Sequence, residues 1–208
     1  LSPDCGHAAD ERNSMIPPNT TCLVILAGGQ SSRMGTDKAV IRLGGERMID
    51  GVIRRFAGKA QRMWLSARND YDTGLPIIPD DPQAPGGPVG GIYSVAGRMQ
   101  AMGIDGFVTV PVDAPFAPAD LIERLSASGG CAVAEDGQRM HPTFAYWRCA
   151  VVNSVRGTHD HGERAPSLQW LARQCGAGTV TWPEERLFLN INRPDDLAAA
   201  IAIKKAGT

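Results

Sequence analysis

The sequence predicts an α/β fold whose central sheet is mostly parallel. Short apolar runs alternate along the chain with segments in which apolar residues recur at helical spacing, and this alternation is typical of strand–helix–strand units. The first run, residues 23–26, contains no polar residue, as expected for a strand that is buried on both faces. It leads directly to Gly28 and Gly29, whose lack of a β-carbon permits a sharp turn after the strand.

Further strands are expected where a short apolar run ends in polar or turn-forming residues. These runs cover residues 63–65, 76–78, 106–112, 131–134 and 142–147. We expect the last of them to run antiparallel to the others and to lie away from the first strands.

Helices are expected between these strands, where apolar residues recur every three or four positions. The residues that would face the sheet are, in chain order, Met48, Ile49, Val52, Ile53 and Phe56; Ile92, Val95, Ala96 and Met99; Leu121, Ile122 and Leu125; and Leu168, Leu171 and Ala172. Pro118 suits the first turn of the third helix, because its missing N–H is not needed there. The last helix is expected to begin at Pro194, with aspartates in its first turn and lysines in its last, as the helix dipole favours.

Composition favours a soluble protein that acts on small molecules. The 208 residues are 43% apolar, which is enough for one substantial core, and the net charge of −1 provides no basic field for nucleic acid. No apolar run approaches the roughly 18–20 residues of a membrane helix. The five cysteines are an odd number without a C-x-x-C pair, so we expect neither a disulfide framework nor a zinc site and favour a reducing cytoplasm.

The chain is expected to consist of two parts. Residues 1–20 are polar and interrupted by prolines, which predicts a flexible N-terminal segment, with Met15 as a candidate initiator after an upstream remnant. Residues 21–208 are expected to form a single domain, in which Cys22 and Cys131 serve as small apolar strand residues.

The segment from residue 23 to residue 38 has the composition of a phosphate-binding loop. After the strand and the glycine pair come Ser31, Ser32, Arg33 and Lys38. Main-chain N–H groups can line the oxygens of a triphosphate, while the two basic side chains neutralise its charge. The order of residues fits neither G-x-x-x-x-G-K-[ST] nor G-x-G-x-x-G, so neither a Walker A loop nor a dinucleotide-binding loop is indicated.

The same segment resembles the signature loop L-A-G-G-x-S-x-R-M-G-x-D-K of the molybdenum cofactor guanylyltransferases. The residues that match are Leu26, Ala27, Gly28, Gly29, Ser32, Arg33, Met34, Gly35, Asp37 and Lys38. The resemblance extends over residues 21–200 and implies a three-layer, Rossmann-like nucleotidyltransferase fold. It also implies an enzyme that transfers GMP from GTP to molybdopterin, forming molybdopterin guanine dinucleotide and releasing pyrophosphate. The nucleotide-binding residues that it implies are Leu26, Ala27, Gly28, Gly29, Lys38, Ser66, Asp80 and Asp113.

Three of these residues stand where predicted strands end, and ligands of open α/β sheets bind at the carboxyl ends of the strands. Ser66 occupies a position where the family commonly has an asparagine. Asp80 aligns with a nucleotide-binding aspartate of the family, and its carboxylate can accept two hydrogen bonds from the N1 and N2 edge of guanine or contact the ribose. Asp113 aligns with a metal-binding aspartate, and Mg²⁺ prefers hard oxygen ligands of this kind.

Each of these three residues also has a structural interpretation. Ser66 is compatible with an ordinary polar turn between a strand and a helix. Asp80 lies in a proline-flanked segment, where a turn aspartate is common for local backbone reasons. Asp113 is compatible with a helix cap.

The resemblance further implies a second-substrate side formed by His141, Arg164, Asn190 and Asn192. His141 belongs to a histidine–proline segment and Arg164 to a Gly-Glu-Arg segment that the family shares. The two asparagines alternate on one face of an extended segment, so both amides are predicted to reach the metal and phosphate region. Capping of the last helix is their alternative role.

In the reaction that the resemblance implies, Arg33, Lys38 and the glycine main chain hold the triphosphate, while Mg²⁺ on Asp113 neutralises charge at the α-phosphate. Catalysis would consist of positioning and charge neutralisation. The attacking phosphate oxygen of molybdopterin is an anion at neutral pH, so no general base is required. Molybdoenzyme maturation proteins are the partners to expect beyond the two substrates.

Two alternative functions remain open at this point. A cytidylyltransferase of the same fold would act on molybdopterin or on a sugar alcohol phosphate, but such relatives tend to carry Leu-Ala-Ala-Gly where this chain has Ala27-Gly28-Gly29. A non-catalytic protein would bind GTP and the cofactor without transfer. The presence of both Lys38 and Asp113 argues against it, because simple binding has little need of charge placed to stabilise pyrophosphate departure.

Overall fold

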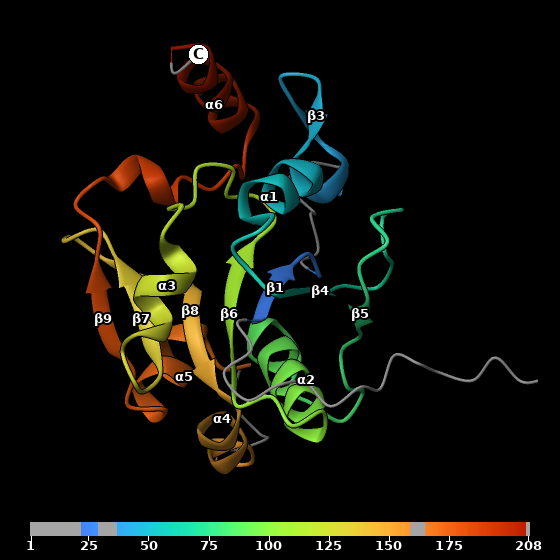
Figure 1. Cartoon of the computed structure of the whole chain (residues 1–208), viewed down its shortest axis with the longest axis vertical. Helices are drawn as coiled ribbons and strands as arrows, with labels where there is room; N and C mark the ends of the chain where they lie inside the picture. Colours follow the sequence, from blue (N-terminus) through green and yellow to red (C-terminus); the bar gives the residue numbers. More distant parts are fainter. Residues whose placement is uncertain (1–21, 29–36, 159–164, 207–208) are drawn as a thin grey trace, which may run out of the picture.

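The structure is a computed structural model that describes residues 22–28, 37–158 and 165–206. Seven strands form one central sheet in the order β5-β4-β1-β6-β8-β7-β9 (Figure 1). Their bounds are β1 Cys22–Leu26, β4 Arg62–Ser66, β5 Ile77–Ile78, β6 Gly106–Pro111, β7 Ala132–Glu135, β8 Met140–Arg148 and β9 Gly178–Thr181. In this sheet β8 is antiparallel to both of its neighbours, and every other pairing is parallel. The mostly parallel sheet and the antiparallel strand are therefore confirmed.

Helices cover both faces of the sheet, which gives the predicted three layers. Successive side chains of a strand point to opposite faces, and β1 shows the consequence: Val24 packs into one apolar cluster and Ile25 into the other. Both side chains are fully buried, and each such burial contributes about 1.5–3 kcal/mol. The first cluster includes residues of α2 (Pro88–Ala101), α4 (Cys149–Val155) and α5 (Leu168–Gln174), and the second includes residues of α1 (Met48–Phe56) and α3 (Leu121–Ser126).

The helices predicted from apolar spacing are present, with one local correction. The expected inner faces of α1 and α2 are buried apart from Ile53, which is partly buried. Pro118 is not in the first turn of α3, because that helix begins at Leu121. The carbonyl of Pro118 instead accepts a hydrogen bond from the Leu121 N–H at 3.2 Å, so the proline belongs to a separate turn that leads into the helix.

Several short elements were not predicted. They are the strands β2 (Arg42–Leu43) and β3 (Glu46–Arg47), the 3-10 helices η2 (Lys38–Val40) and η3 (Glu185–Phe188), helix α4 and strand β9. Strands of two residues are too short to show a hydrophobic period. Both described residues of the β2–β3 turn, Gly44 and Gly45, have positive φ angles of 64° and 91°, which glycine adopts without a steric cost.

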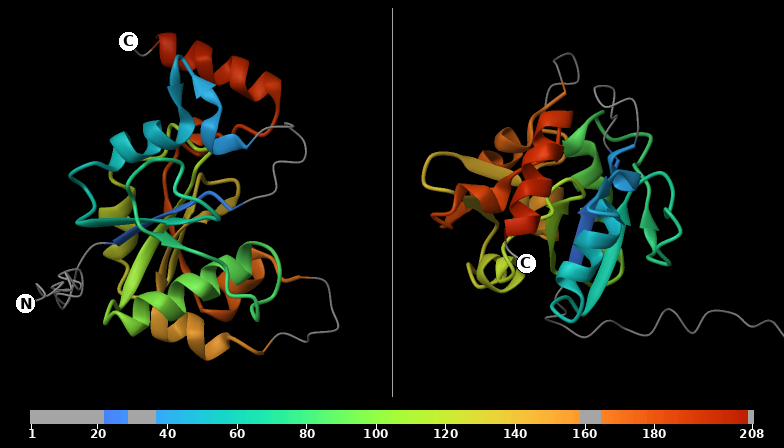
Figure 2. Two further views of the ribbon diagram at one scale, coloured as in Figure 1. Left: turned by 90° about the vertical axis from the view of Figure 1, so that its right-hand side faces the viewer. Right: turned by 90° about the horizontal axis from the view of Figure 1, so that it is seen from above.

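The C-terminal helix α6 (Pro194–Ala206) lies beside the β2–β3 sheet, above the central sheet (Figure 2). It begins at Pro194 as predicted. Lys204 Nζ contacts Glu46 Oε2 at 3.3 Å and donates to the Leu43 carbonyl at 3.2 Å. Together with Arg54, Lys204 lowers the pKa of Glu46 to about 2. These contacts hold the end of the chain against the segment that follows Lys38.

Two further properties concern the whole described part of the chain. Its four cysteines are buried thiols, and burial raises the pKa of Cys22 and Cys149 to about 12. Among the described helices, none combines the length and the hydropathy that a bilayer crossing requires.

Candidate functional site

The ends of the three central parallel strands meet at one edge of the sheet. Leu26, the last residue of β1, is paired with Ser66 of β4 on one side and with Pro111 of β6 on the other. The ladder continues past the strand, because the Ala27 N–H donates to the Ser66 carbonyl at 2.9 Å and the Val112 N–H donates to the Leu26 carbonyl at 3.1 Å. The predicted residues that follow these strands are thus placed side by side at the carboxyl edge.

Lys38 joins two of the predicted residues at this edge. Its Nζ lies 2.6 Å from Asp113 Oδ2 and 2.6 Å from Asn192 Oδ1. The Lys38 and Asp113 side chains are 20% and 12% exposed, so the pair is largely screened from water yet open on one side. We call Lys38, Asp113 and Asn192 the phosphate-side cluster. Its three residues come from segments 75 and 154 positions apart.

Each residue of the phosphate-side cluster is held by its own local structure. Lys38 is the first residue of η2, whose N-cap Asp37 accepts a hydrogen bond from the Ala39 N–H through Oδ1 at 3.0 Å. Asp113 follows β6, and its carbonyl accepts from the Ile191 N–H at 3.0 Å. This bond aligns the asparagine segment with the strand end. Asp113 does not cap α3, because Asp120 holds that helix's N-cap position.

The two predicted asparagines differ in their contacts. Asn192 reaches Lys38 with its amide oxygen. The side-chain oxygen of Asn190 is buried and has no hydrogen-bond partner among the described residues, which is a costly arrangement unless a ligand or water supplies a donor or cation. Capping of α6 is carried out by Asp196, whose Oδ2 accepts from the N–H groups of Asn192 and Arg193 at 2.9 Å each.

Ser66 and Asp80 meet at the first turn of α2, which we call the base side. A β-carbon placed on Gly91 would lie 3.4 Å from Asp80 Oδ1 and 3.5 Å from Ser66 Oγ. Ser66 is buried, whereas Asp80 is exposed. Glycine at residue 91 therefore leaves the space between these two polar groups free of a side chain.

The contacts typical of a turn aspartate belong to Asp81, the neighbour of Asp80. Asp81 Oδ1 accepts from the Gln83 N–H at 2.9 Å, and Oδ2 accepts from Arg156 Nη2 at 2.5 Å. The Asp81 N–H donates to Ser94 Oγ at 2.8 Å. The Gln83 N–H first, and then Arg156, hold the pKa of Asp81 below its usual value. Asp81 thus shapes the loop and leaves the carboxylate of Asp80 at its surface.

Close packing against α2 also fixes this loop. A β-carbon on Gly90 would lie 1.9 Å from the carbonyl oxygen of Pro85, far inside any contact distance. The Ser94 hydroxyl, which accepts from Asp81, donates in turn to the Gly90 carbonyl at 2.8 Å. The loop over residues 79–87 therefore rests on a part of α2 where only glycine fits.

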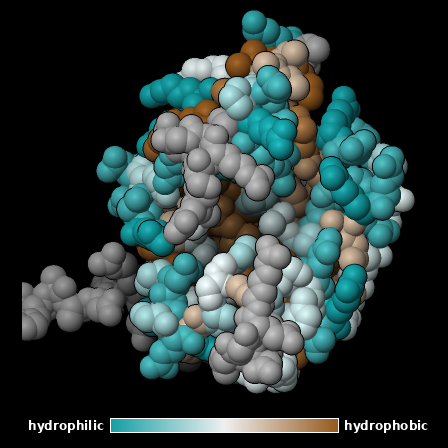
Figure 3. Space-filling view, turned by 180° about the vertical axis from the view of Figure 1, so that it is seen from behind, coloured by the Kyte–Doolittle hydropathy of each residue, from teal (hydrophilic) through white to brown (hydrophobic). Residues whose placement is uncertain are grey.

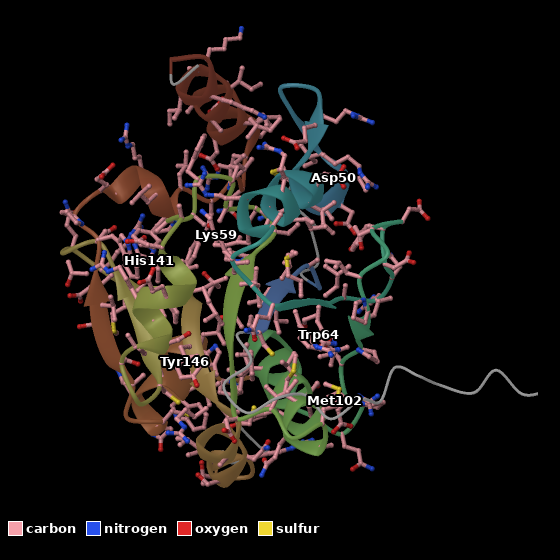
Figure 4. All side chains as sticks on the ribbon, viewed as in Figure 1. Asp50, Lys59, Trp64, Met102, His141 and Tyr146 are labelled. Atoms are coloured by element: carbon pink, nitrogen blue, oxygen red, sulfur yellow. The ribbon has the colours of Figure 1, made fainter. Side chains whose placement is uncertain are left out.

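His141 lies in a separate, buried cluster. Its Nε2 is 2.8 Å from Asp136 Oδ2, and its ring stacks on Phe188 with centroids 4.4 Å apart. Asp136 also accepts from the N–H groups of Gln138 and Arg139, and these bonds, followed by His141, keep its pKa well below the usual value. Figure 4 shows His141 at one end of β8 and Tyr146 toward the other.

Tyr71 is a residue of this edge that the sequence analysis missed. Its hydroxyl lies 2.7 Å from Asp37 Oδ2 and 3.3 Å from the Ala27 carbonyl. The backbone φ angle of Tyr71 is 52°, a left-handed conformation that bulky residues rarely adopt. No periodic or motif signal marks this residue, because neither its backbone conformation nor its contact with Asp37 follows from local spacing.

The remaining predicted residues are placed only in part. Leu26 is the last residue of β1, and Ala27 follows it directly. At Gly28, a β-carbon would lie 3.5 Å from the carbonyl oxygen of Ser66. Gly29, Arg33 and Arg164 lie outside the described residues. The predicted phosphate-binding loop is thus described only before residue 29 and from Asp37 onward.

The donor set at the phosphate-side cluster fits a hard divalent cation. Within the described residues there is no group of three or more His, Cys, Asp and Glu side chains that could hold a metal ion alone. Mg²⁺ needs no such cage, because it commonly takes one or two carboxylates together with substrate phosphates and water. Asp113 supplies such a carboxylate at this edge.

The face turned away in Figure 1 is hollowed near its middle, and apolar side chains show at the floor of the hollow (Figure 3). Polar side chains surround it on several sides. A recess of this kind, with an apolar floor and a few polar groups at its margin, is typical of small-molecule sites.

Known proteins are similar to this chain in sequence and in fold. The MobA-like NTP transferase domain family matches residues 23–174. A molybdenum cofactor guanylyltransferase from Cereibacter sphaeroides is 40% identical over 184 residues, covering 85% of this chain and 93% of the relative. One from Rhodobacter capsulatus is 37% identical with the same coverage.

Solved structures agree with this fold. Molybdopterin-guanine dinucleotide biosynthesis protein A from Archaeoglobus fulgidus is similar with a TM-score of 0.71 and 19% identity, over 89% of this chain and all of that chain. The 2-C-methyl-D-erythritol 4-phosphate cytidylyltransferase from Thermus thermophilus has a TM-score of 0.63 and 20% identity, over 89% of this chain and 98% of that chain.

Proposed function

We propose roles for the site residues from one premise: the chain belongs to the MobA-like NTP transferase family and, within it, to the molybdenum cofactor guanylyltransferases. It is an enzyme that transfers GMP from GTP in molybdenum cofactor biosynthesis, with GTP and molybdopterin as its substrates. The fold does not distinguish this activity from cytidylyl transfer, since a cytidylyltransferase shares it. The sequence identity to the guanylyltransferases does, because it covers most of the chain.

The contact between Lys38 and Asp113 is the observation that carries the assignment of the phosphate side. The ammonium of Lys38 already lies at the end of the phosphate-binding loop, beside a carboxylate at a strand tip. An incoming triphosphate offers Lys38 oxygens of higher charge, so Lys38 exchanges its contact with Asp113 for the phosphates. Asp113 then becomes free to bind a cation. Arg33 and the main chain of Gly28 and Gly29 complete the triphosphate site in this proposal.

A divalent metal is consistent with this family, and we assign it as Mg²⁺ held by Asp113. When bound, Mg²⁺ would withdraw charge from the α-phosphate and screen the incoming anion. The chain's own residues position the reactants and neutralise charge. No general base is needed, because the attacking phosphate oxygen of molybdopterin carries a negative charge at neutral pH.

We assign Asp80 and Ser66 to the nucleotide base. Asp80 presents an exposed carboxylate beside Gly91, and the N1 and N2 edge of guanine offers two donors to such a group. Cytosine lacks this pair of adjacent donors, so the wrong base would leave the carboxylate unsatisfied.

We assign His141, Arg164, Asn190 and Asn192 to the side of the second substrate, and Asn192 joins that side to the phosphate-side cluster through its contact with Lys38. His141 would act there by holding the residue 136–141 turn in place, because its ring is buried and paired with Asp136. Transfer of the product to molybdoenzyme maturation proteins, and a cytoplasmic location, complete the proposal. The four described cysteines are buried free thiols, which is typical of a reducing compartment.

Calorimetric titration with GTP, CTP, ATP and GMP in the presence of Mg²⁺ tests these assignments. We expect GTP to bind most tightly. In Lys38→Ala, GTP affinity is expected to fall about 10- to 100-fold while GMP affinity changes less, because charge-assisted hydrogen bonds to the β- and γ-phosphates are lost. Equal losses for GTP and GMP would contradict the role of Lys38, and a preference for CTP would contradict the role of Asp80.

A further inference from the structure

Residues 69–74 form a strained turn beside the phosphate-side cluster. Tyr71 and Asp72 have φ angles of 52° and 56° and are the only described non-glycine residues with positive φ. L-amino acids avoid this region because the β-carbon crowds the backbone, and a large aromatic residue there is a true outlier. Strain of this kind persists where the surrounding contacts enforce it, and it is concentrated at functional sites.

The turn is enforced by contacts on both sides of Tyr71. Asn69 Oδ1 accepts from the Tyr71 N–H at 3.2 Å, and Asp70 Oδ1 accepts from the Asp72 N–H at 3.1 Å. The Tyr71 carbonyl accepts from Arg47 Nη1 at 2.8 Å. Arg47 is itself fixed by a two-point contact with Asp50, at 2.6 and 2.7 Å. The strained backbone is therefore tied to the first turn of α1, where Figure 4 labels Asp50.

This backbone directs the Tyr71 side chain at the turn that carries Lys38. The hydroxyl has one proton, and Asp37 Oδ2 at 2.7 Å is a closer and more strongly charged acceptor than the Ala27 carbonyl at 3.3 Å. Burial, followed by the contact with Asp37, raises the pKa of Tyr71. The hydroxyl is therefore protonated and a donor at neutral pH.

Both oxygens of Asp37 are thereby used. Oδ1 accepts from the Ala39 N–H and so closes the turn of η2, while Oδ2 accepts from Tyr71. Rotation of the Asp37 carboxylate would break both bonds at once. Lys38 lies between Asp37 and Ala39, which the first of these bonds joins. Its Nζ lies 2.6 Å from Asp113 Oδ2 and 2.6 Å from Asn192 Oδ1.

We propose that Tyr71 is a positioning residue for GMP transfer, whose hydroxyl holds Asp37 and thereby sets the place of the Lys38 ammonium. This inference rests on the proposed role of Lys38 in binding the triphosphate. Tyr71 acts through Asp37 on the phosphate side. The contacts that enforce the left-handed backbone at Tyr71 maintain this alignment, because a relaxed backbone would direct the ring elsewhere.

Steady-state kinetics of Tyr71→Phe, Asp37→Asn and the double variant test the proposal. Loss of one hydrogen bond to a charged group predicts a decrease of about tenfold in kcat/KM for GTP in Tyr71→Phe. The double variant is expected to be no worse than Asp37→Asn alone, since an asparagine that keeps the bond from the Ala39 N–H presents an amide nitrogen to Tyr71, which cannot accept from its hydroxyl. KM for molybdopterin is expected to stay within about twofold of wild type, and the thermal unfolding midpoint is expected to fall by no more than a few degrees, because a single hydrogen bond is lost.

Tyr146→Phe is the matched control. Tyr146 is also a partly buried tyrosine, but its hydroxyl lies beside Gly106 at the start of β6, whereas Asp113 follows the end of that strand. It is expected to retain wild-type kinetics. If Tyr71→Phe also retains wild-type kcat/KM, or if its loss adds fully to that of Asp37→Asn, the positioning role is wrong.

Failure of this proposal can be distinguished from failure of the proposed function. A fully active Tyr71→Phe together with an impaired Lys38→Ala would refute the positioning role of Tyr71 and leave the role of Lys38 intact. A Lys38→Ala enzyme with normal GTP affinity would refute the role of Lys38 itself.

Discussion

On the phosphate side, the proposed functional groups hold one another, whereas on the base side the groups that hold the structure and the group offered to a ligand are different residues. Lys38, Asp113 and Asn192 are in direct contact. In the loop over residues 79–87, which we call the base loop, Asp81 makes the bonds to Gln83 and Arg156, and its neighbour Asp80 remains exposed.

The difference has a physical cause. In the proposed function the ligand of the phosphate side carries several negative charges, and the ion pair with Asp113 keeps the ammonium of Lys38 beside its proposed site. The proposed ligand of the base side is neutral and is recognised by the geometry of its hydrogen bonds, which a rigid frame favours. Gly90 against Pro85 and Asp81 against Ser94 provide that frame.

The largest expected effect is the loss of Asp113. In Asp113→Asn the shape is kept and the negative charge is removed, so turnover is expected to fall about 100- to 1,000-fold, as it does when a single electrostatic contact to the transition state is lost. Stability is expected to fall by about 1–3 kcal/mol, because the pair is largely screened from water and Asp113→Asn leaves Lys38 with a neutral partner. The measurements are single-turnover rates and urea denaturation.

Near-normal turnover of Asp113→Asn would show that Asp113 only keeps Lys38 in place. A decrease in turnover that is relieved by raising the Mg²⁺ concentration would instead support the proposed role of Asp113 in binding the cation. That result would locate the lost function in cation affinity.

The next largest effect is expected at Gly90. An alanine there would place its β-carbon 1.9 Å from the Pro85 carbonyl, so the base loop must move away from α2. We expect a loss of about 1–3 kcal/mol in stability, as for other overpacked sites, and a decrease in affinity for GTP. Gly97→Ala in the same helix is the control, because the nearest described neighbour of its added carbon is the end of the Arg156 side chain at 3.8 Å.

The base side and the phosphate side are structurally independent if the GTP affinity of Gly90→Ala falls while its pyrophosphate affinity stays at the wild-type value. Equal losses of affinity for both ligands would show that the two sides move together.

The two sides also differ in how far the sequence predicts them. Asp113 and Asp80 each follow an apolar strand, and the carboxyl ends of parallel strands meet at one edge of the sheet. The position of both residues at this edge could therefore be predicted from spacing. The contact of Lys38 with Asn192 spans 154 positions and depends on how α6 and the preceding segment fold back. Only the resemblance to known guanylyltransferases pointed to Asn192.

The division of labour between Asp80 and Asp81 could not be predicted. Both stand in the same Pro-Asp-Asp-Pro segment, and local propensity treats them alike. Their difference arises from Ser94 and Arg156, which come from α2 and from the end of α4 and contact Asp81 alone. In the same way, the burial of His141 against Asp136 and Phe188 depends on η3, an element too short to show a periodic pattern.

The least severe change exchanges Asp80 or Asp81 for asparagine. It tests directly whether the residue that holds the base loop differs from the residue that faces the base. Asp80→Asn is expected to lower GTP affinity about tenfold, the equivalent of one charge-assisted hydrogen bond, and to reduce the preference for GTP over ITP, which lacks the 2-amino donor. Stability should be unchanged, because Asp80 is exposed and the contacts that fix the loop belong to Asp81. Asp81→Asn should show the reverse pattern, with a small loss of stability and an unchanged ratio of GTP to ITP affinity, since its partners are Gln83 and Arg156. Calorimetric titration of both variants with both nucleotides measures the two ratios. If Asp81→Asn alters the ratio of GTP to ITP affinity as strongly as Asp80→Asn does, the residue that holds the loop also takes part in recognising the base. The base side would then be built like the phosphate side.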